Sequence, residues 1–106
     1  MLFCKTVFVV KMIVVENVSS LDQFLDAVKR FRRIVVGGDG CVECRVLLHM
    51  VTECVDAYVK LSFDLDGDLI DYLFKNNVFG IPFVVVDGEI VYDTNLFRLK
   101  KIVCGV

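Results

Sequence analysis

The sequence predicts an α/β protein of three layers, in which a central mixed sheet is flanked by helices. Apolar β-branched runs alternate with segments whose apolar residues recur at helical spacing, and this alternation indicates a sheet between helical layers. The expected order is β-α-β-α-β-α-β-β-α, and the closing pair of strands makes the sheet mixed. The chain has 106 residues, which is enough for one domain and too few for two, so we expect a single domain over residues 1–106.

The first strand is expected at residues 6–15, where β-branched residues are frequent. Ser20 and Gln23 have the spacing of a capping box, which predicts the start of a helix that ends at about residue 31. Residues 34–36 form a short and wholly apolar run, typical of a strand buried on both faces.

The rest of the chain continues the same alternation. Residues 37–40 (GGDG) are expected as a turn, followed by a helix at 42–55 in which apolar residues form one broad face. Asp87-Gly88 between two apolar runs predicts a tight hairpin, because both turn residues need positive φ. The remaining elements are expected as a strand at 57–63, a helix at about 68–76, hairpin strands at 83–86 and 89–92, and a helix at about 94–103.

The composition and charge of the chain argue against some classes of function. The net charge is −2, so no excess of positive charge favours binding to nucleic acid. One basic cluster is explained as the solvated end of a helix, and it consists of Lys29, Arg30, Arg32 and Arg33. No run of about 18 apolar residues exists, so we expect no membrane span. The N-terminal segment lacks the features of a signal peptide, which predicts a cytoplasmic protein.

Five cysteines are present, and an odd number does not suit a secreted disulfide framework. Cys41 and Cys44 form a CxxC pair, whereas the other three are expected to be bystanders. Cys54 falls in an apolar helical segment and is interpreted as a small core residue. Cys4 and Cys104 lie near the two ends of the chain, and a bridge between them is left open.

Residues 41–54 also have the spacing C-x2-C-x4-H-x4-C of a zinc knuckle. A knuckle needs glycines to turn its backbone, and this stretch has none. On a helix, His49 would lie about 140° around the axis from Cys44, so four ligands would not converge on one tetrahedral ion. We therefore expect no metal site and interpret His49 as exposed, with zinc kept as a minor alternative.

The redox-dithiol interpretation accounts for more of the sequence. Gly40 ends a turn that leads directly into a helix, which puts Cys41 at the helix N-terminus. Unpaired backbone amides and the helix dipole stabilise negative charge there, so they favour the thiolate of Cys41, which is the nucleophile in disulfide exchange. Cys44, one turn further on, is more covered and suits the resolving role.

Gly80-Ile81-Pro82 contains the only proline of the chain and precedes the hairpin. A cis bond at Pro82 would leave the backbone of Ile81 free beside the cysteines. An extended substrate could then pair with that backbone as an added strand. An ordinary trans proline at the start of a strand is the alternative.

The chain resembles the thioredoxin superfamily over essentially its whole length. The resemblance rests on CVEC at the start of a helix, on the strand AYVKLSFD and on the hairpin FGIPFVVVDGEIV. Its N-terminal β-α unit is more similar to thioredoxin than to minimal glutaredoxins. The resemblance implies that Cys41 is the nucleophile, that Cys44 is the resolving thiol and that the bond before Pro82 is cis.

The chain departs from the family pattern at several positions. It has no tryptophan, and Val35 stands where the resemblance implies a buried aspartate. The lysine that partners this aspartate is matched by Lys60. Because the carboxylate itself is missing, the proton acceptor for Cys44 is unassigned, and Glu43 and water are the alternatives. Glu43 is expected to oppose ionisation of Cys41 by charge repulsion, which predicts a reducing pair.

We therefore expect an enzyme that reduces protein disulfides by cycling Cys41 and Cys44. It would need no cofactor besides this redox-active disulfide, and its electron donor is unidentified. Substrates are expected to bind across an apolar surface around Gly40, Ile81 and Pro82. The alternative is a protein-binding module of the same fold with little or no redox turnover.

Overall fold

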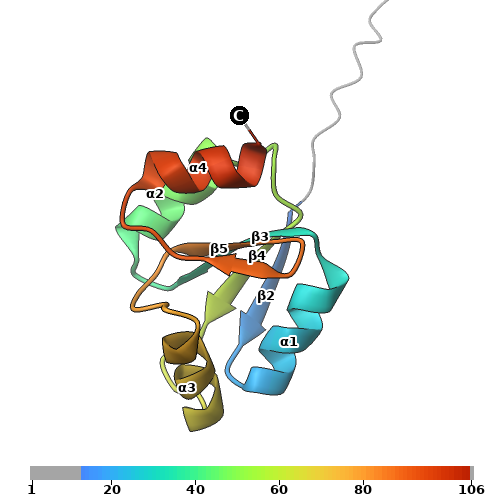
Figure 1. Ribbon diagram of the computed structural model, residues 1–106, viewed down its shortest axis with the longest axis vertical. Coiled ribbons are helices and arrows are strands. Elements are labelled where there is room, and N and C mark those ends of the chain that lie inside the picture. The colour runs from blue at the N-terminus through green and yellow to red at the C-terminus, as the bar shows by residue number, and fades with distance from the viewer. Residues whose placement is uncertain (1–12, 106) are drawn as a thin grey trace, which may run out of the picture.

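The structure is a computed structural model that describes residues 13–105 (Figure 1). Its elements follow one another in the predicted order β-α-β-α-β-α-β-β-α. The strands are β2 (Val14–Val18), β3 (Arg33–Gly38), β4 (Ala57–Leu61), β5 (Phe83–Val86) and β6 (Glu89–Val91). The helices are α1 (Leu21–Arg30), α2 (Val42–Met50), α3 (Gly67–Lys75) and α4 (Leu96–Cys104).

The strands form one sheet in the order β2-β4-β3-β5-β6. β4 is parallel to both β2 and β3, whereas β5 is antiparallel to β3 and to β6. The sheet is therefore mixed, as the closing hairpin predicts. β3 lies at its centre, and the site described below begins where β3 ends.

Helices cover both faces of the sheet, with α2 and α4 on one face and α1 and α3 on the other (Figure 1). Successive residues of β3 pack alternately into two hydrophobic cores, one on each face of the sheet. Ile34 and Val36 belong to the core under α1 and α3, and Val35 belongs to the core under α2 and α4. All three are fully buried. The wholly apolar run at 34–36 is thus explained by burial on both faces.

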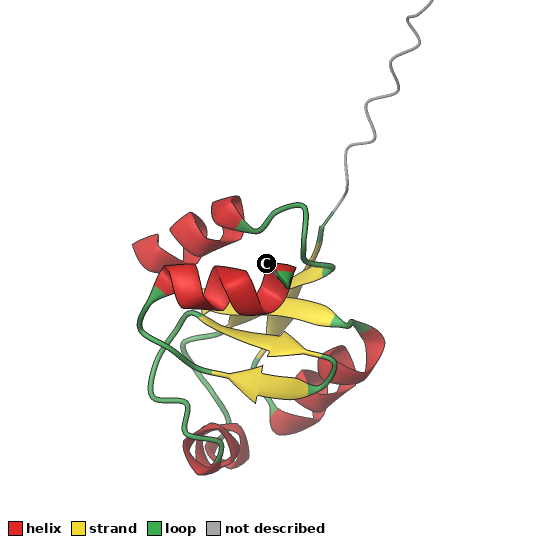
Figure 2. Cartoon of the chain, turned by 45° about the horizontal axis from the view of Figure 1, so that its top comes forward, coloured by secondary structure: helices red, strands yellow, loops and turns green. Residues whose placement is uncertain are grey.

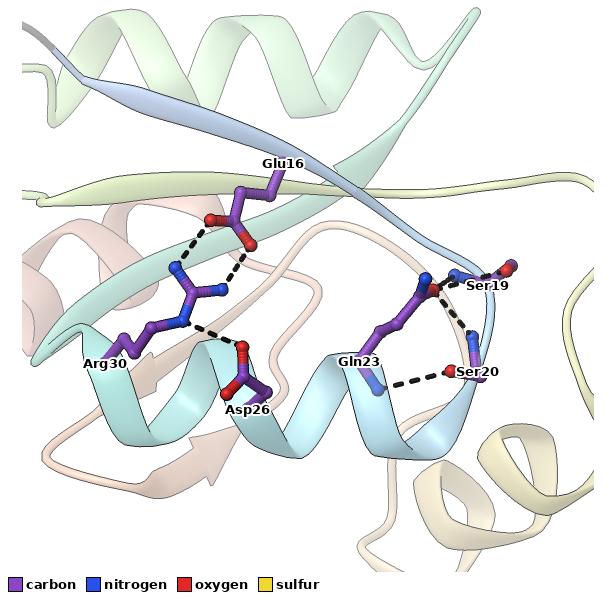
Figure 3. Close-up of polar contacts among 6 residues, drawn as sticks. All are labelled: Glu16, Ser19, Ser20, Gln23, Asp26 and Arg30. Carbon is purple, nitrogen blue, oxygen red and sulfur yellow. Dashed lines mark hydrogen bonds and ion pairs between the residues drawn. The ribbon is translucent and has the colours of Figure 1, made fainter.

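The predicted capping box is present at the start of α1. The Ser20 side chain accepts a hydrogen bond from the Gln23 amide at 3.2 Å, and the Gln23 side chain accepts one from the Ser20 amide at 3.3 Å (Figure 3). Two amides that the helix leaves unpaired are satisfied in this way.

The basic cluster at the end of α1 is partly neutralised. Arg30 contacts the carboxylate of Glu16 with two nitrogens and that of Asp26 with a third (Figure 3). The hydrogen bonds from Arg30 hold the pKa of Glu16 below its usual value. Arg32 pairs with Asp87 in the hairpin turn at 2.7 Å. The interpretation as a solvated helix end therefore omitted these acidic partners.

The hairpin has the turn that its sequence predicts. Asp87 and Gly88 have φ values of 52° and 82°, which is the left-handed region that asparagine, aspartate and glycine tolerate best. β5 and β6 pair in register on either side of the turn, with Val85 opposite Ile90. The hairpin closes the sheet at the β6 edge.

Several boundaries differ from the predictions. Most of the expected strand at 6–15 lies outside the described residues, and β2 continues to Val18. The expected turn at 37–40 is wrong in its first half, because Gly37 and Gly38 belong to β3 and are buried. α4 begins later than expected, since the Asn95 side chain accepts hydrogen bonds from two amides of its first turn.

The helix expected at 42–55 ends at Met50. Residues 51–54 form turns instead, and the Thr52 hydroxyl donates a hydrogen bond to the Leu48 carbonyl at 2.8 Å. Such a bond competes with the continuation of a helix. The strand expected at 57–63 likewise ends early, at Leu61, and leaves Phe63 88% exposed.

The interpretation of Cys54 as a bystander is wrong. Cys54 forms a disulfide with Cys104, with a Cα–Cα distance of 5.2 Å. This bridge joins the turn after α2 to the last residue of α4, so it ties together the two helices that cover one face of the sheet. Cys4, the other partner considered for Cys104, lies outside the described residues.

We expect the double variant Cys54→Ala/Cys104→Ala to be less stable by about 3–4 kcal/mol, because the bridge closes a loop with a sequence separation of 50 residues and restricts the unfolded chain. Urea unfolding of both proteins, with oxidised Cys41–Cys44, measures the difference. An unchanged unfolding free energy would mean that this bridge does not form in the protein in solution.

Candidate functional site

The site is built around a disulfide at the start of α2. Cys41 and Cys44 are bonded, with a Cα–Cα distance of 5.3 Å. Cys41 is the N-cap residue of α2, and its sulfur accepts a hydrogen bond from the backbone amide of Cys44 at 3.1 Å. A backbone N–H of the first turn of the helix therefore points at this sulfur, and a helix N-terminus is the environment that stabilises a thiolate.

The two cysteines differ in exposure, and this difference suits different roles. Cys41 is half-buried, whereas Cys44 is fully buried against the sheet. An incoming disulfide could meet the sulfur of Cys41 first. Cys44 lies close enough to bond to it and is shielded from solvent, which matches the position expected for a resolving thiol.

A short turn brings Cys41 to the end of the central strand. β3 ends at Gly38, and Gly40 has a φ of 73°, a conformation that glycine adopts without strain. Nothing lies within 4 Å of the place where a Cβ of Gly40 would be. The backbone beside Cys41 is thus left open to a partner.

Ile81 and Pro82 lie on the other side of this strand end. The peptide bond between them is cis. Ile81 packs on the end of β3. A Cβ added to Gly38, the last residue of that strand, would lie 3.0 Å from the Cδ1 of Ile81. Ile81 and Pro82 also line a small pocket together with Glu43 of α2. The fold therefore brings the two sequence motifs, CVEC and GIP, to one edge of the molecule.

An apolar groove of about 550 Å³ continues from this edge toward α3. Its lining includes Ile81 and also Gly38 and Asp39, which precede Cys41 in the chain. Much of the remaining lining is aromatic and exposed, and it includes Phe63, Phe74 and Phe79, of which 88%, 55% and 65% are accessible. Exposed aromatic side chains clustered in this way are typical of a binding surface.

Lys60 has a carboxylate partner that the sequence analysis did not identify. Its ammonium lies 2.6 Å from Asp39, in the turn before Cys41. The hydrogen bond from Lys60 to Asp39 raises the pKa of the lysine. Val35 is buried and apolar, so the lysine does not pair with a residue at the position where the resemblance implies an aspartate. Asp39 comes from the turn between strand and helix instead.

Tyr58 is a further residue that sequence analysis missed. A Cβ added to Gly37 would lie 2.5 Å from the Tyr58 hydroxyl oxygen and 2.8 Å from the Cβ of Cys44, so the phenol and the buried cysteine are neighbours across this glycine. Burial raises the pKa of Tyr58. The signal in the sequence is a polar aromatic residue two positions before Lys60 on a buried strand.

The zinc-knuckle residues do not assemble into a site. Cys54 is bonded to Cys104, and His49 is exposed on α2. Over residues 13–105, no three histidine, cysteine, aspartate or glutamate side chains come together in a way that would hold a metal ion.

No family model and no curated protein matches the sequence. Solved structures match the fold instead. Reduced thioredoxin pre-protein of Schistosoma mansoni is 12% identical, with a TM-score of 0.54 and coverage of 85% of this chain and 95% of that one. Mitochondrial thioredoxin 3 of Saccharomyces cerevisiae is 17% identical, with a TM-score of 0.55 and coverage of 87% and 95%.

A third match is a putative oxidoreductase with a thioredoxin fold, which is 22% identical with a TM-score of 0.52 and covers 87% of this chain and 88% of that one. These likenesses extend over most of each chain and show a common architecture. In the part of the chain that the structure describes, no helix has the length and apolar character of a bilayer span.

Glu43 is exposed in the first turn of α2, two residues from Cys41. We expect Glu43→Gln to lower the pKa of Cys41, because it removes a negative charge that opposes the thiolate. Alkylation of the reduced protein below neutral pH should then be about twofold faster, since water screens an exposed charge. A slower or unchanged reaction, relative to the wild type at equal ionic strength, would rule out this influence of Glu43.

Proposed function

We propose that this protein, which has a thioredoxin fold, is a thiol–disulfide oxidoreductase that reduces disulfides of other proteins. The observation that carries the proposal is the position of Cys41 as N-cap of α2, with its sulfur bonded to that of Cys44 and facing a backbone amide. The pocket that Ile81 and Pro82 line together with Glu43 and the apolar groove that includes Ile81 support it.

The reaction follows from the different exposure of the two sulfurs. In the reduced protein, the Cys41 thiolate attacks one sulfur of a substrate disulfide R–S–S–R′, forms a mixed disulfide with R–S and releases R′–S⁻. Cys44 then loses its proton, which the released R′–S⁻ takes up. The Cys44 thiolate attacks the sulfur of Cys41 and releases R–S⁻. Two electrons have passed to the substrate, and the Cys41–Cys44 bond has formed.

The substrate would bind across the strand end between the two motifs. An extended segment can pair with the open backbone at Ile81 in the manner of an added strand, while Gly40 leaves room beside Cys41. Apolar side chains of the substrate would enter the groove lined by Phe74 and Phe79. We infer from this apolar lining that the substrates are proteins that expose hydrophobic residues near their disulfide.

The cycle requires no cofactor besides the disulfide itself. A thiol reductant must return the two electrons by the reverse exchange, and its identity is open. The cytoplasmic location stays a prediction. The Cys54–Cys104 bridge does not favour it, since reducing compartments keep most thiols free.

A protein-binding module without turnover is the second candidate. The exposed aromatic groove favours it, because such a surface would bind a partner whether or not the cysteines react. Val35 also favours it, since an apolar residue stands where the resemblance implies an acidic one.

We expect the wild type to reduce insulin disulfides with dithiothreitol as the electron source, and Cys41→Ser to lose at least a hundredfold in rate, because the serine hydroxyl is not ionised at neutral pH. Cys54→Ala/Cys104→Ala serves as the control that removes a disulfide away from the site. Equal rates for wild type and Cys41→Ser would eliminate the enzyme and leave the binding module.

For the groove, we expect Phe79→Ser to raise the KM for a protein disulfide about tenfold, since an apolar contact of that size stabilises a complex by about 1.5 kcal/mol or more. The rate with a small soluble disulfide should not change. Phe97→Ser is the matched control, because Phe97 is 69% exposed and does not line the groove. Equal KM values for the two variants would place substrate binding elsewhere.

A further inference from the structure

The buried cysteine of the pair must be ionised before it can attack, and its surroundings are unfavourable for charge. Cys44 is fully buried, and burial without a partner opposes thiolate formation. Val35 is apolar and part of the core, and the ammonium of Lys60 is bonded to Asp39, so neither of these residues offers a free polar group to the thiolate.

Tyr58 is the polar side chain that the fold brings against Cys44. It projects from β4 on the face that α2 covers, and it packs in the same core as Val35 and Leu47. The Tyr58 hydroxyl and the Cβ of Cys44 both border the space where a side chain of Gly37 would be, because a Cβ there would lie 2.5 Å from the first atom and 2.8 Å from the second. A side chain at position 37 would clash with both atoms, so the glycine permits this packing.

The hydroxyl has a proton to donate. Burial raises the pKa of Tyr58, and Asp39 adds to this effect, while Lys60 and a hydrogen bond with the backbone of Gly38 lower it. The raised pKa keeps the phenol neutral at neutral pH, so its oxygen carries a proton that it can donate.

We propose that Tyr58 is a positioning residue for the resolving step, and that its hydroxyl donates a hydrogen bond to the sulfur of Cys44 when this sulfur becomes a thiolate. The inference rests on the proposed function, because it concerns the second half of the same exchange. No net proton transfer to Tyr58 is needed, since the Cys44 proton goes to the substrate thiolate released first. Tyr58 stabilises the charge that remains.

The test separates the two halves of the exchange with an aromatic disulfide, 5,5′-dithiobis(2-nitrobenzoate). Attack by Cys41 releases one coloured thiolate, and attack by Cys44 on the resulting mixed disulfide releases the second. A Cys41→Ser/Cys44→Ser variant gives the signal from the remaining cysteines, which is subtracted. Tyr58→Phe removes only the hydroxyl, and Tyr72→Phe is the matched control, because Tyr72 packs against Phe24 under the other face of the sheet.

In Tyr58→Phe, the second release should be about tenfold slower at pH 7, because the variant loses one hydrogen bond to a charged group. The pH midpoint of the second release should also be higher than in the wild type. The first release should be unchanged, and high pH should restore the second, because the thiolate then forms without a donor. Tyr72→Phe should match the wild type in both phases.

An unchanged pH midpoint of the second release in Tyr58→Phe would overturn the proposal, as would equal slowing of both phases, which is the result of a merely structural role. Insulin reduction by the wild type tests the proposed function independently of Tyr58, so a failure of one proposal can be told from a failure of the other. If both releases behave as expected and insulin is not reduced, the role of Tyr58 stands and the proposed substrate class is wrong. If the wild type gives no second release, both proposals fall.

Discussion

The chemistry proposed for this protein depends on one interaction, the hydrogen bond from the backbone of α2 to the sulfur of Cys41. A helix leaves its first amides unpaired, and here the residue that caps them is a cysteine. The same geometry that starts the helix therefore also lowers the cost of negative charge on the sulfur. The turn at Gly40, the burial of Cys44 and the approach of Ile81 have functional value only because Cys41 is the cap.

The rest of the fold holds this cap in place. β3, at the centre of the sheet, contributes to both cores and ends two residues before Gly40. α2 and α4 cover one face of the sheet (Figure 2). The Cys54–Cys104 bridge ties these two helices together. The helix that carries the reactive sulfur is thus fixed at its first turn by packing of Cys44 and beyond its last turn by a covalent bond.

Much of this arrangement could be predicted from local signals. The capping box at Ser20, the Asp87-Gly88 turn and the apolar run at 34–36 act over a few residues, so the sequence displays them directly. The Cys54–Cys104 bridge could not be predicted, because it depends on how two distant helices dock. Tyr58 was missed for the same reason, since it comes from another strand and packs beside Cys44 where position 37 is a glycine. Asp39 was correctly interpreted as part of a turn, but its pairing with Lys60 was not identified.

The most direct measurement of the central claim is the pH dependence of the alkylation rate of Cys41 in the reduced protein, followed by peptide mass so that each cysteine is resolved. The account predicts that the pKa of this thiol lies clearly below that of an ordinary cysteine, about 8.5. A midpoint at or above that value would contradict it, since the amides at the start of α2 would then confer no reactivity on the sulfur.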